Sequence, residues 1–427
     1  MKLKSYEKIR EQIYSDRLPN GMPVFVVPKR GYNKSYAFFA TDYGSVDRRF
    51  KYGGKWLDTP EGVAHFLEHK MFDTEDGNAL TSLSANGASP NAFTSSDITA
   101  YHFESTEKFE ENLEILLSFV SIPWFTPESV QKEQGIIAQE IRMTEDSPDH
   151  AVYYGLMKAL FRHNPIRDSI AGTVDSIAGI TSDTLYDCHR VFYNPSNMAL
   201  CVTGDVDPER IVSIAARTLP RESGERPRRD YGPDEDKAPA GGGTTSSMEV
   251  SRPIFLLGAK ADGATSGRDF LRRNLTGSLA LGLLAGNSSP LYMRLYEEGL
   301  IDSDFSAAFE TSAGVAYSMA GGGSREPEAV FAEFKKEADA LGADGPDAEL
   351  FSRVKKAYTG GLLRALNSFD SICYNCVSGY FRGYDAFESA DVLESVTADD
   401  VREFIRVNLA PDNMAMSTIT PKQEAAN

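Results

Sequence analysis

Runs of apolar residues and their spacing predict strands and helices in separate groups along the first third of the chain. The strand-like runs are rich in β-branched and aromatic residues and are bounded by turn-forming residues. The helical runs have apolar residues three or four positions apart, and one of them begins with Thr126 as N-cap and Pro127 in the first turn. The predicted strands are 23–28, 35–40, 91–94 and 98–103, and the predicted helices are 60–72, 105–120 and 126–143. This mixture is typical of an α+β fold.

One helix-to-strand segment occurs twice in the chain. The run 181–200 recurs without a gap as 397–416, and both copies carry Pro-x-Asn-Met-Ala before the predicted strand. Coincidence at two such junctions is the alternative, but the length of the match favours an internal duplication. The segment between the copies combines proline, glycine and charge, which is typical of an exposed linker. We therefore predict two similar domains, 1–224 and 245–427, joined by a linker over 225–244.

Two glycine runs lack the setting of a phosphate-binding loop. Gly241–Gly243 falls in the predicted linker, and Gly321–Gly323 is interpreted as a turn before a helix over 327–341. Neither run lies between a strand and a helix in the way that a nucleotide-binding fingerprint requires. A nucleotide site is therefore not expected.

The composition is normal for a soluble globular protein, with 41% hydrophobic and 25% charged residues. A formal net charge of −18 argues against nucleic acid or an anionic membrane surface as the main partner. The N-terminal residues are mixed in charge and lack a following apolar run, so they are not expected to form a signal peptide, and no apolar run has the length of a membrane span. Cys373 and Cys376 form a single C-x-x-C in a helix-like segment, which favours ordinary thiols over a structural zinc or redox pair. We expect a cytoplasmic protein.

The helix over 60–72 carries the candidate chemistry. His65, Glu68 and His69 are three and four positions apart, so their side chains leave one face of the helix and can converge on one point. The apolar residues lie more to the other side, where they can pack into a core. Two imidazoles one turn apart with a carboxylate beside them indicate a zinc site.

The start of this helix is predicted from capping residues. Asp58 or Thr59 is expected to be the N-cap, and Pro60 the first helical residue, where a missing N–H costs nothing.

A catalytic zinc usually has three protein ligands, so one ligand must come from another segment. The helix over 126–143 offers Glu133 and Glu140, seven positions apart and on one face. One of them can complete a His/His/Glu site while the other hydrogen-bonds a ligand, and the spacing alone does not choose between them. Glu68 would then act as general base on water activated by the metal and would pass the proton to the leaving nitrogen. A solvated helix face is the alternative, but it would not require a second helix with two carboxylates.

These residues resemble the pitrilysin/insulinase metallopeptidases, a family with the inverted zinc motif H-x-x-E-H. The motif is present here as His65-Phe66-Leu67-Glu68-His69. The resemblance extends over nearly the whole chain, through Gly62-Val63-Ala64, Asn91-Ala92-Phe93-Thr94, Glu133, Glu140, Pro195-Ser196-Asn197-Met198-Ala199 and Gly204-Asp205.

The resemblance implies a zinc-dependent endopeptidase that hydrolyses short or unfolded peptides and holds one Zn²⁺ per chain. It implies two homologous α/β-sandwich domains, each an antiparallel-rich sheet packed with helices, which together form half of a clamshell chamber. By the family pattern Glu140 is the third ligand and Glu133 a supporting carboxylate. Asn91 and Ala92 match the edge strand that binds an extended peptide through main-chain hydrogen bonds.

The second half of the chain departs from the family pattern. Members often carry an arginine and a tyrosine there, within a segment resembling L-R-E-x-x-G-L-x-Y, to hold the substrate and the developing oxyanion. Leu295 and Asp302 stand at those two positions here, and Arg294 is one position out of register. The second half is therefore expected to lack this contribution.

The departure bears on the partner. The resemblance implies the zinc-bearing member of a bacterial heterodimeric peptidase, whose same-family partner lacks the zinc motif and supplies the missing pair. A homodimeric peptidase that uses Arg294 or another residue is one alternative. A non-catalytic scaffold or assembly subunit of the same fold is the other, although loss of motif residues usually marks that route.

Overall fold

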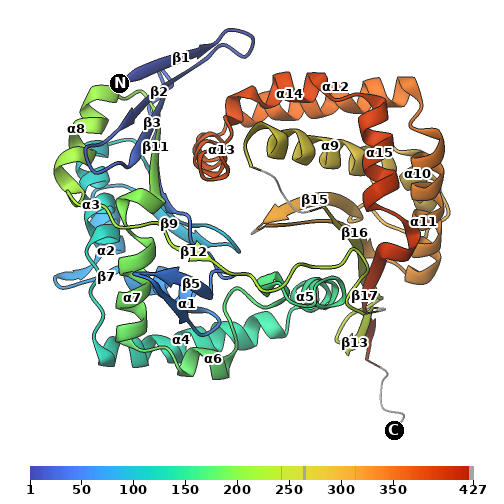
Figure 1. Cartoon of the computed structure of the whole chain (residues 1–427), viewed down its shortest axis with the longest axis horizontal. Coiled ribbons are helices and arrows are strands. Elements are labelled where there is room, and N and C mark those ends of the chain that lie inside the picture. Colours follow the sequence, from blue (N-terminus) through green and yellow to red (C-terminus); the bar gives the residue numbers. More distant parts are fainter. Residues whose placement is uncertain (242, 263–265, 313, 423–427) are drawn as a thin grey trace. The chain divides into compact units, whose positions relative to one another are not determined.

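The computed structural model describes residues 1–241, 243–262, 266–312 and 314–422, which form two compact units (Figure 1). Each unit is discontinuous in sequence. The first contains Met1–Ile141, Ser169–Tyr231 and Leu363–Phe387, and the second contains the described residues of Arg142–Asp168, Gly232–Leu362 and Glu388–Asn427. Each has a sheet with helices on both faces, which confirms the predicted α+β class. The boundaries predicted from the duplication, 1–224 and 245–427, stay a prediction about the sequence.

The first unit is built on a seven-stranded sheet that is antiparallel except for one parallel pair. In spatial order its strands are β1 (Lys2–Tyr6), β2 (Glu11–Arg17), β3 (Pro23–Pro28), β11 (Met198–Gly204), β4 (Ser35–Thr41), β10 (Thr99–Ser105) and β9 (Ser89–Thr94). Among the described strands of this sheet, only β3 and β11 run parallel to each other. The strands predicted over 23–28, 35–40, 91–94 and 98–103 are thereby confirmed. β9 is an edge strand, so one side of its backbone has no strand partner in the described part of the sheet.

The second unit repeats this topology with five strands. In spatial order they are β13 (Thr244–Met248), β17 (Met414–Pro421), β14 (Ile254–Ala261), β16 (Val315–Gly323) and β15 (Ser306–Ser312). β13 and β17 run parallel and the remaining pairs antiparallel, as in the run β3-β11-β4-β10-β9 of the first unit. The internal duplication therefore extends to the strand order of both sheets.

The segment that occurs twice in the sequence has the same structure in both units. In the first, Thr181 caps α7 (Ser182–Phe192), and a 3₁₀ turn leads into β11. In the second, Thr397 caps α15 (Ala398–Asn408), and a 3₁₀ turn leads into β17. Both threonine hydroxyls accept the backbone N–H of the third residue of their helix, which satisfies a donor that the helix cannot pair. The predicted helix-to-strand repeat is confirmed.

One helix of each sequence half covers the sheet of the other half. α13 (Phe369–Arg382) packs on β11 and β4 of the first unit, while α5 (Pro148–Leu160) packs on β17 and β14 of the second (Figure 1). On the opposite face of the first sheet lie α1 (Val63–Met71) and α3 (Phe109–Ser121). Because successive strand residues point to opposite faces, the first sheet has two separate cores. The four cysteines of the chain are free thiols, and all are buried.

The glycines Gly321–Gly323 do not form the predicted turn. They are the last residues of β16 and pair with the start of β14. A β-carbon on Gly321 would lie 2.0 Å from the carbonyl oxygen of Phe255, so the neighbouring backbone leaves no space for a side chain. The run therefore reflects close packing of two strands, and the helix predicted after it is α11 (Pro327–Asp344).

The predicted linker forms hydrogen bonds with residues of both units. β12 (Arg228–Arg229) pairs with β5 (Arg49–Tyr52) in the first unit. Further on, the Glu235 carboxylate accepts the backbone N–H groups of Arg162, His163 and Asn164 at 2.6–3.0 Å and also meets Lys260 at 3.3 Å. Burial alone would raise the pKa of Glu235, but these donors outweigh it and lower the pKa to about 2. Gly242 of this segment lies outside the described residues.

Glu235→Gln is expected to destabilise the chain at neutral pH by about 1–3 kcal/mol, because it removes a charge that accepts several hydrogen bonds. The pKa is lower in the folded state than the ordinary value of 4.5. The contribution of Glu235 is therefore complete above about pH 4.5 and is lost as the pH falls toward 2. Denaturant titrations should show a difference between wild type and variant at pH 7 that narrows below pH 4. Asp234→Asn, at an exposed neighbour, should follow wild type throughout.

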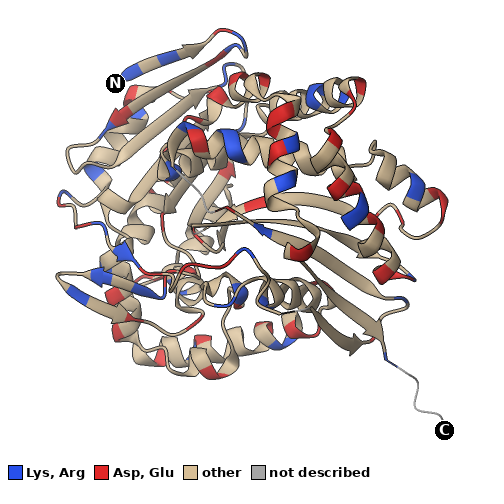
Figure 2. Cartoon of the chain, turned by 45° about the vertical axis from the view of Figure 1, so that its right-hand side comes forward, with Lys and Arg blue, Asp and Glu red and all other residues tan. Residues whose placement is uncertain are grey.

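The remaining elements complete the layers. They are β6 (Lys55–Asp58), β7 (Asp73–Thr74), β8 (Gly77–Asn78), α2 (Ala79–Ala85), α4 (Pro127–Glu145), α6 (Val174–Ala178), α8 (Pro208–Thr218), α9 (Gly267–Ala285), α10 (Pro290–Glu297), α12 (Ala348–Ala365) and α14 (Ser389–Ser395). Acidic and basic residues are interspersed along the helices, so the net charge is not concentrated in one element (Figure 2). Within the described residues, each helix is too short or too polar to cross a bilayer.

Candidate metal centre

The first helix of the centre starts later than its capping residues suggested. α1 begins at Val63, and its N-cap is Gly62, whose φ of +87° lies in the left-handed region. A β-carbon at this position would lie 2.4 Å from the carbonyl oxygen of Ala171, so glycine is required for two reasons. The predicted N-cap at Asp58 or Thr59 is therefore wrong, and the hydroxyl of Thr59 instead donates to the carbonyl of Arg48.

The apolar side of α1 fixes the direction of its polar side. Val63, Phe66, Leu67 and Met71 are buried in the core against β9 and β10, as the sequence predicted. Because residues three and four apart share a helix face, this packing brings the side chains of His65, Glu68 and His69 to one common face.

The third potential metal ligand is Glu140, which comes from α4. His65 Nε2 lies 3.4 Å from Glu140 Oε1, and His69 Nε2 lies 3.6 Å from Glu140 Oε2. One potential ligand atom from each of the three residues lies within 4.8 Å of the other two. Among the described residues, this is the group of His, Cys, Asp or Glu side chains that could hold a metal ion.

The second carboxylate of α4 contacts the other side of one imidazole. His69 Nδ1 lies 3.1 Å from Glu133 Oε1, so the ring donates this N–H to Glu133 while Nε2 faces Glu140. Such a bond fixes both the tautomer and the orientation of a metal-binding imidazole. Nδ1 of His65 is buried and has no hydrogen-bond partner within the described part of the chain. Glu133 and Glu140 therefore have different positions, which their spacing in sequence could not reveal.

The charges of the centre shift the protonation of its members. Burial lowers the pKa of His69, but the hydrogen bond to Glu133 and the charges of Glu68 and Glu140 outweigh it, so the net pKa is raised. The contact with His65 lowers the pKa of Glu140 despite partial burial. The site thus places a carboxylate charge directly beside two imidazoles, an arrangement suited to a cation.

Glu68 lies beside these three residues and contacts the edge strand. Its side chain is buried, and Oε2 accepts a hydrogen bond of 2.8 Å from Thr94 Oγ1 at the end of β9. Asn91 and Ala92 lie in the same strand, with Asn91 exposed and Ala92 packed against the core under α1. No role was predicted for Thr94 from the sequence. The alternation of strand residues could have placed Thr94 on the same face as Ala92.

Two segments of the chain match models of one peptidase family. Residues 53–174 match the family model described as "Insulinase (Peptidase family M16)", and residues 179–358 match "Peptidase M16 inactive domain". A Bacillus subtilis (strain 168) protein named "Uncharacterized zinc protease YmfH" is 39% identical over 98% of both chains. The chain belongs to the M16 peptidase family. As an M16 protein, it is related to metallopeptidases, and its resemblance to the pitrilysin/insulinase group is confirmed.

Solved structures give the same assignment at the level of the fold. The M16 chain has a TM-score of 0.93 and 34% identity to an M16-like peptidase from Alicyclobacillus acidocaldarius, covering 96% of this chain and 99% of that one. The first half of the periplasmic protease PqqL from Escherichia coli has a TM-score of 0.74 at 16% identity, covering 96% and 92% of the two chains. Pitrilysin has a TM-score of 0.76 at 17% identity, and the chain spans 46% of its length.

The remaining histidines lie outside the metal group of this M16 chain. His189 is buried and donates a hydrogen bond to the carbonyl of Val120, and burial lowers its pKa to about 4. His102 is half-buried among aromatic rings of the first sheet.

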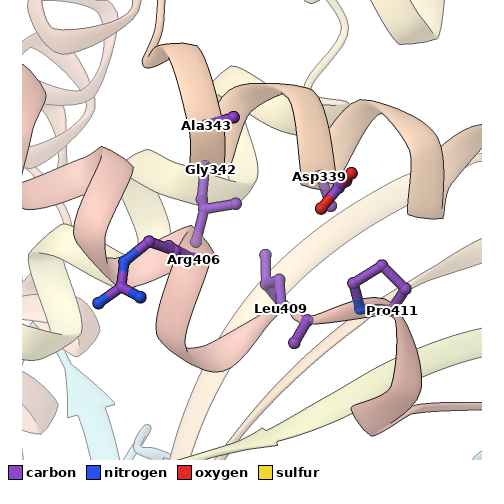
Figure 3. A pocket seen from close by; sticks show the side chains of 9 residues that line it. Asp339, Gly342, Ala343, Arg406, Leu409 and Pro411 are labelled. Carbon is purple, nitrogen blue, oxygen red and sulfur yellow. The ribbon is translucent and has the colours of Figure 1, made fainter.

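A cavity of about 220 Å³ lies in the second unit, between α11 and the end of α15 (Figure 3). Asp339 and Arg406 are its charged lining residues, while Gly342, Leu409 and Pro411 give it an apolar wall. The guanidinium of Arg406 forms two hydrogen bonds with Glu403. Of the two charged lining residues, Asp339 is therefore the one whose charge is not paired within the described residues. The lining residues do not include a group of side chains that could hold a metal ion, as the metal centre does.

Proposed function

We propose that this chain is a zinc-dependent endopeptidase that hydrolyses short or unfolded peptides. The observation that carries the proposal is the convergence of His65, His69 and Glu140 beside a buried Glu68. The name of the Bacillus subtilis relative supports zinc as the metal.

The donor set suits one Zn²⁺ ion. Two imidazole nitrogens and one carboxylate oxygen are typical ligands of a hydrolytic zinc, and they leave a fourth position open. Both Nε2 atoms face Glu140, and the Nδ1 of His69 is already bonded to Glu133. We infer that His65, His69 and Glu140 hold the ion and that Glu133 orients His69. When bound, zinc lowers the pKa of water and polarises the scissile carbonyl.

Glu68 is assigned the proton transfers. It lies on the same face of α1 as the two histidines, and its Oε1 is not engaged by Thr94. In this position Glu68 takes a proton from the attacking water and delivers it to the leaving nitrogen, so that no covalent intermediate with the protein is needed.

The edge strand is assigned the binding of substrate. β9 is the edge strand among the described strands of its sheet, and it lies against α1, which carries three of the site residues. An extended peptide that pairs with Asn91 and Ala92 would therefore run past the metal centre, and main-chain hydrogen bonds would hold it regardless of most side chains.

The second unit does not offer the arginine and tyrosine that the family pattern contains. Leu295 is fully buried, and Asp302 forms an ion pair with Arg252. The guanidinium of Arg294 lies 3.2 Å from carboxylate oxygens of both Glu333 and Glu337. Its positive charge is therefore paired with two carboxylates of its own unit. These contacts support a heterodimer in which a same-family subunit supplies the missing groups. The similarity to single halves of longer peptidases supports pairing as well.

The partner proposal predicts that the zinc-loaded chain alone hydrolyses an unfolded protein or a peptide mixture far more slowly than the paired assembly. Light scattering of the purified chain, alongside its peptidase rate, checks this. Full activity of a monomer would contradict any pairing, and full activity of a homodimer would contradict the heterodimer. Cytoplasmic location stays a prediction from the sequence.

A further inference from the structure

Glu68 makes one side-chain hydrogen bond among the described residues, and this bond joins it to the edge strand. Thr94 Oγ1 donates to Glu68 Oε2 at 2.8 Å, and the Glu68 side chain is only 8% exposed. A carboxylate in such a place can rotate about its terminal bond unless a neighbour fixes it. Oε1 is left without a side-chain donor in the described part of the chain.

The fold places Thr94 at this carboxylate through strand register. Thr94 is the last residue of β9 and lies directly opposite Thr99, the first residue of β10. Directly opposed residues point to the same face of a sheet, and here that face is covered by α1. The threonine therefore reaches Glu68 from the sheet on which α1 packs, while the outer edge of the same strand has no strand partner among the described residues.

Thr94 has two polar side chains beside it, the carboxylate of Glu68 at 2.8 Å and the hydroxyl of Thr99 at 3.5 Å. Thr99 Oγ1 donates to the carbonyl of Tyr43 at 2.9 Å, so its single proton is already used. The hydroxyls of Tyr101 and Tyr193 bond each other at 2.8 Å in the core beneath. Burial is the main cause that raises the pKa of both tyrosines, and the charge of Glu68 adds to it, so both hydroxyls stay protonated. Since a carboxylate only accepts, the Thr94 proton is directed to Glu68.

We propose that Thr94 is a positioning residue that holds Oε2 of Glu68 and leaves Oε1 as the atom that takes the proton. The inference rests on the proposed peptidase function. Because Thr94 also belongs to the strand assigned to substrate binding, it ties the orientation of the base to that strand. A charged acceptor with one fixed donor is held more firmly than a neutral pair would be.

Thr94→Val removes the hydroxyl and keeps the shape of the side chain. In the assembly that hydrolyses peptide, the variant should lower kcat about 10- to 100-fold with little change in KM or in zinc per chain. Thr94→Ser keeps a hydroxyl and should restore most of kcat. Thr203→Val is the matched control, because Thr203 is buried in the same sheet and its hydroxyl contacts Cys373 instead; kcat should stay near wild type.

A second readout does not depend on activity. A crystal structure of zinc-loaded Thr94→Val should show the Glu68 carboxylate rotated away from its wild-type orientation. An unchanged carboxylate, full kcat in Thr94→Val, or no recovery in Thr94→Ser would each overturn the positioning role. If these results occur while Glu68→Gln is inactive, the proposed peptidase function stands. If Glu68→Gln retains full turnover, the peptidase mechanism fails and the role of Thr94 fails with it.

Discussion

Glu68→Gln is expected to abolish peptide hydrolysis while the chain retains its zinc. Glutamine keeps the size of the side chain and can still face Thr94, but it cannot take a proton from water. General bases contribute about 10²–10⁴-fold to rate, so kcat should fall by at least this range. The three proposed ligands, His65, His69 and Glu140, are unchanged. Zinc per chain by plasma mass spectrometry and peptide turnover by mass spectrometry, measured on the same preparation, check both halves of the expectation.

The control must separate loss of the base from loss of a negative charge. Glu222→Gln makes the same chemical change at an exposed residue and should behave as wild type. Retained turnover in Glu68→Gln would refute the assignment of the base. Loss of zinc in this variant would instead indicate that Glu68 takes part in holding the ion.

Glu140→Gln is expected to lose far more zinc affinity than Glu133→Gln. The carboxylate of Glu140 faces both Nε2 atoms, so its replacement by an amide removes an anionic ligand. Glu133 contacts the outer nitrogen of His69, and glutamine at this position can still accept that N–H. For Glu133→Gln the expected loss is about 10- to 100-fold. Competition with a chelator of known affinity measures both.

Glu128→Gln, at an exposed residue of the same helix, is the matched control and should bind zinc like wild type. An equal loss in the two variants would mean that the ion is not confined to one carboxylate. A larger loss in Glu133→Gln would reverse the two roles.

Several elements could be predicted because their signals are local. The strands at 23–28 and 35–40, the two capped helices of the repeat and the side-by-side placement of His65, Glu68 and His69 depend on residues within one or two turns of one another. The failures also had a common cause. Gly62 and Gly321 look like ordinary helix-flanking and turn glycines, but each is required by a carbonyl from a distant segment, Ala171 and Phe255 respectively. A close approach of distant backbone leaves no periodic pattern in the sequence.

The sequence by itself determined the chemical components of this protein, which are two imidazoles and a carboxylate on one helix face, two further carboxylates on another helix, and a duplicated α+β framework. It could not separate Glu133 from Glu140, because residues seven apart on one helix face are equivalent until a partner is placed opposite them. Only the tertiary structure decided this, by packing α1 and α4 so that Glu140 faces both Nε2 atoms and Glu133 the outer nitrogen of His69. It also brought Thr94 to Glu68, since strand pairing and helix packing set distances between residues far apart in sequence.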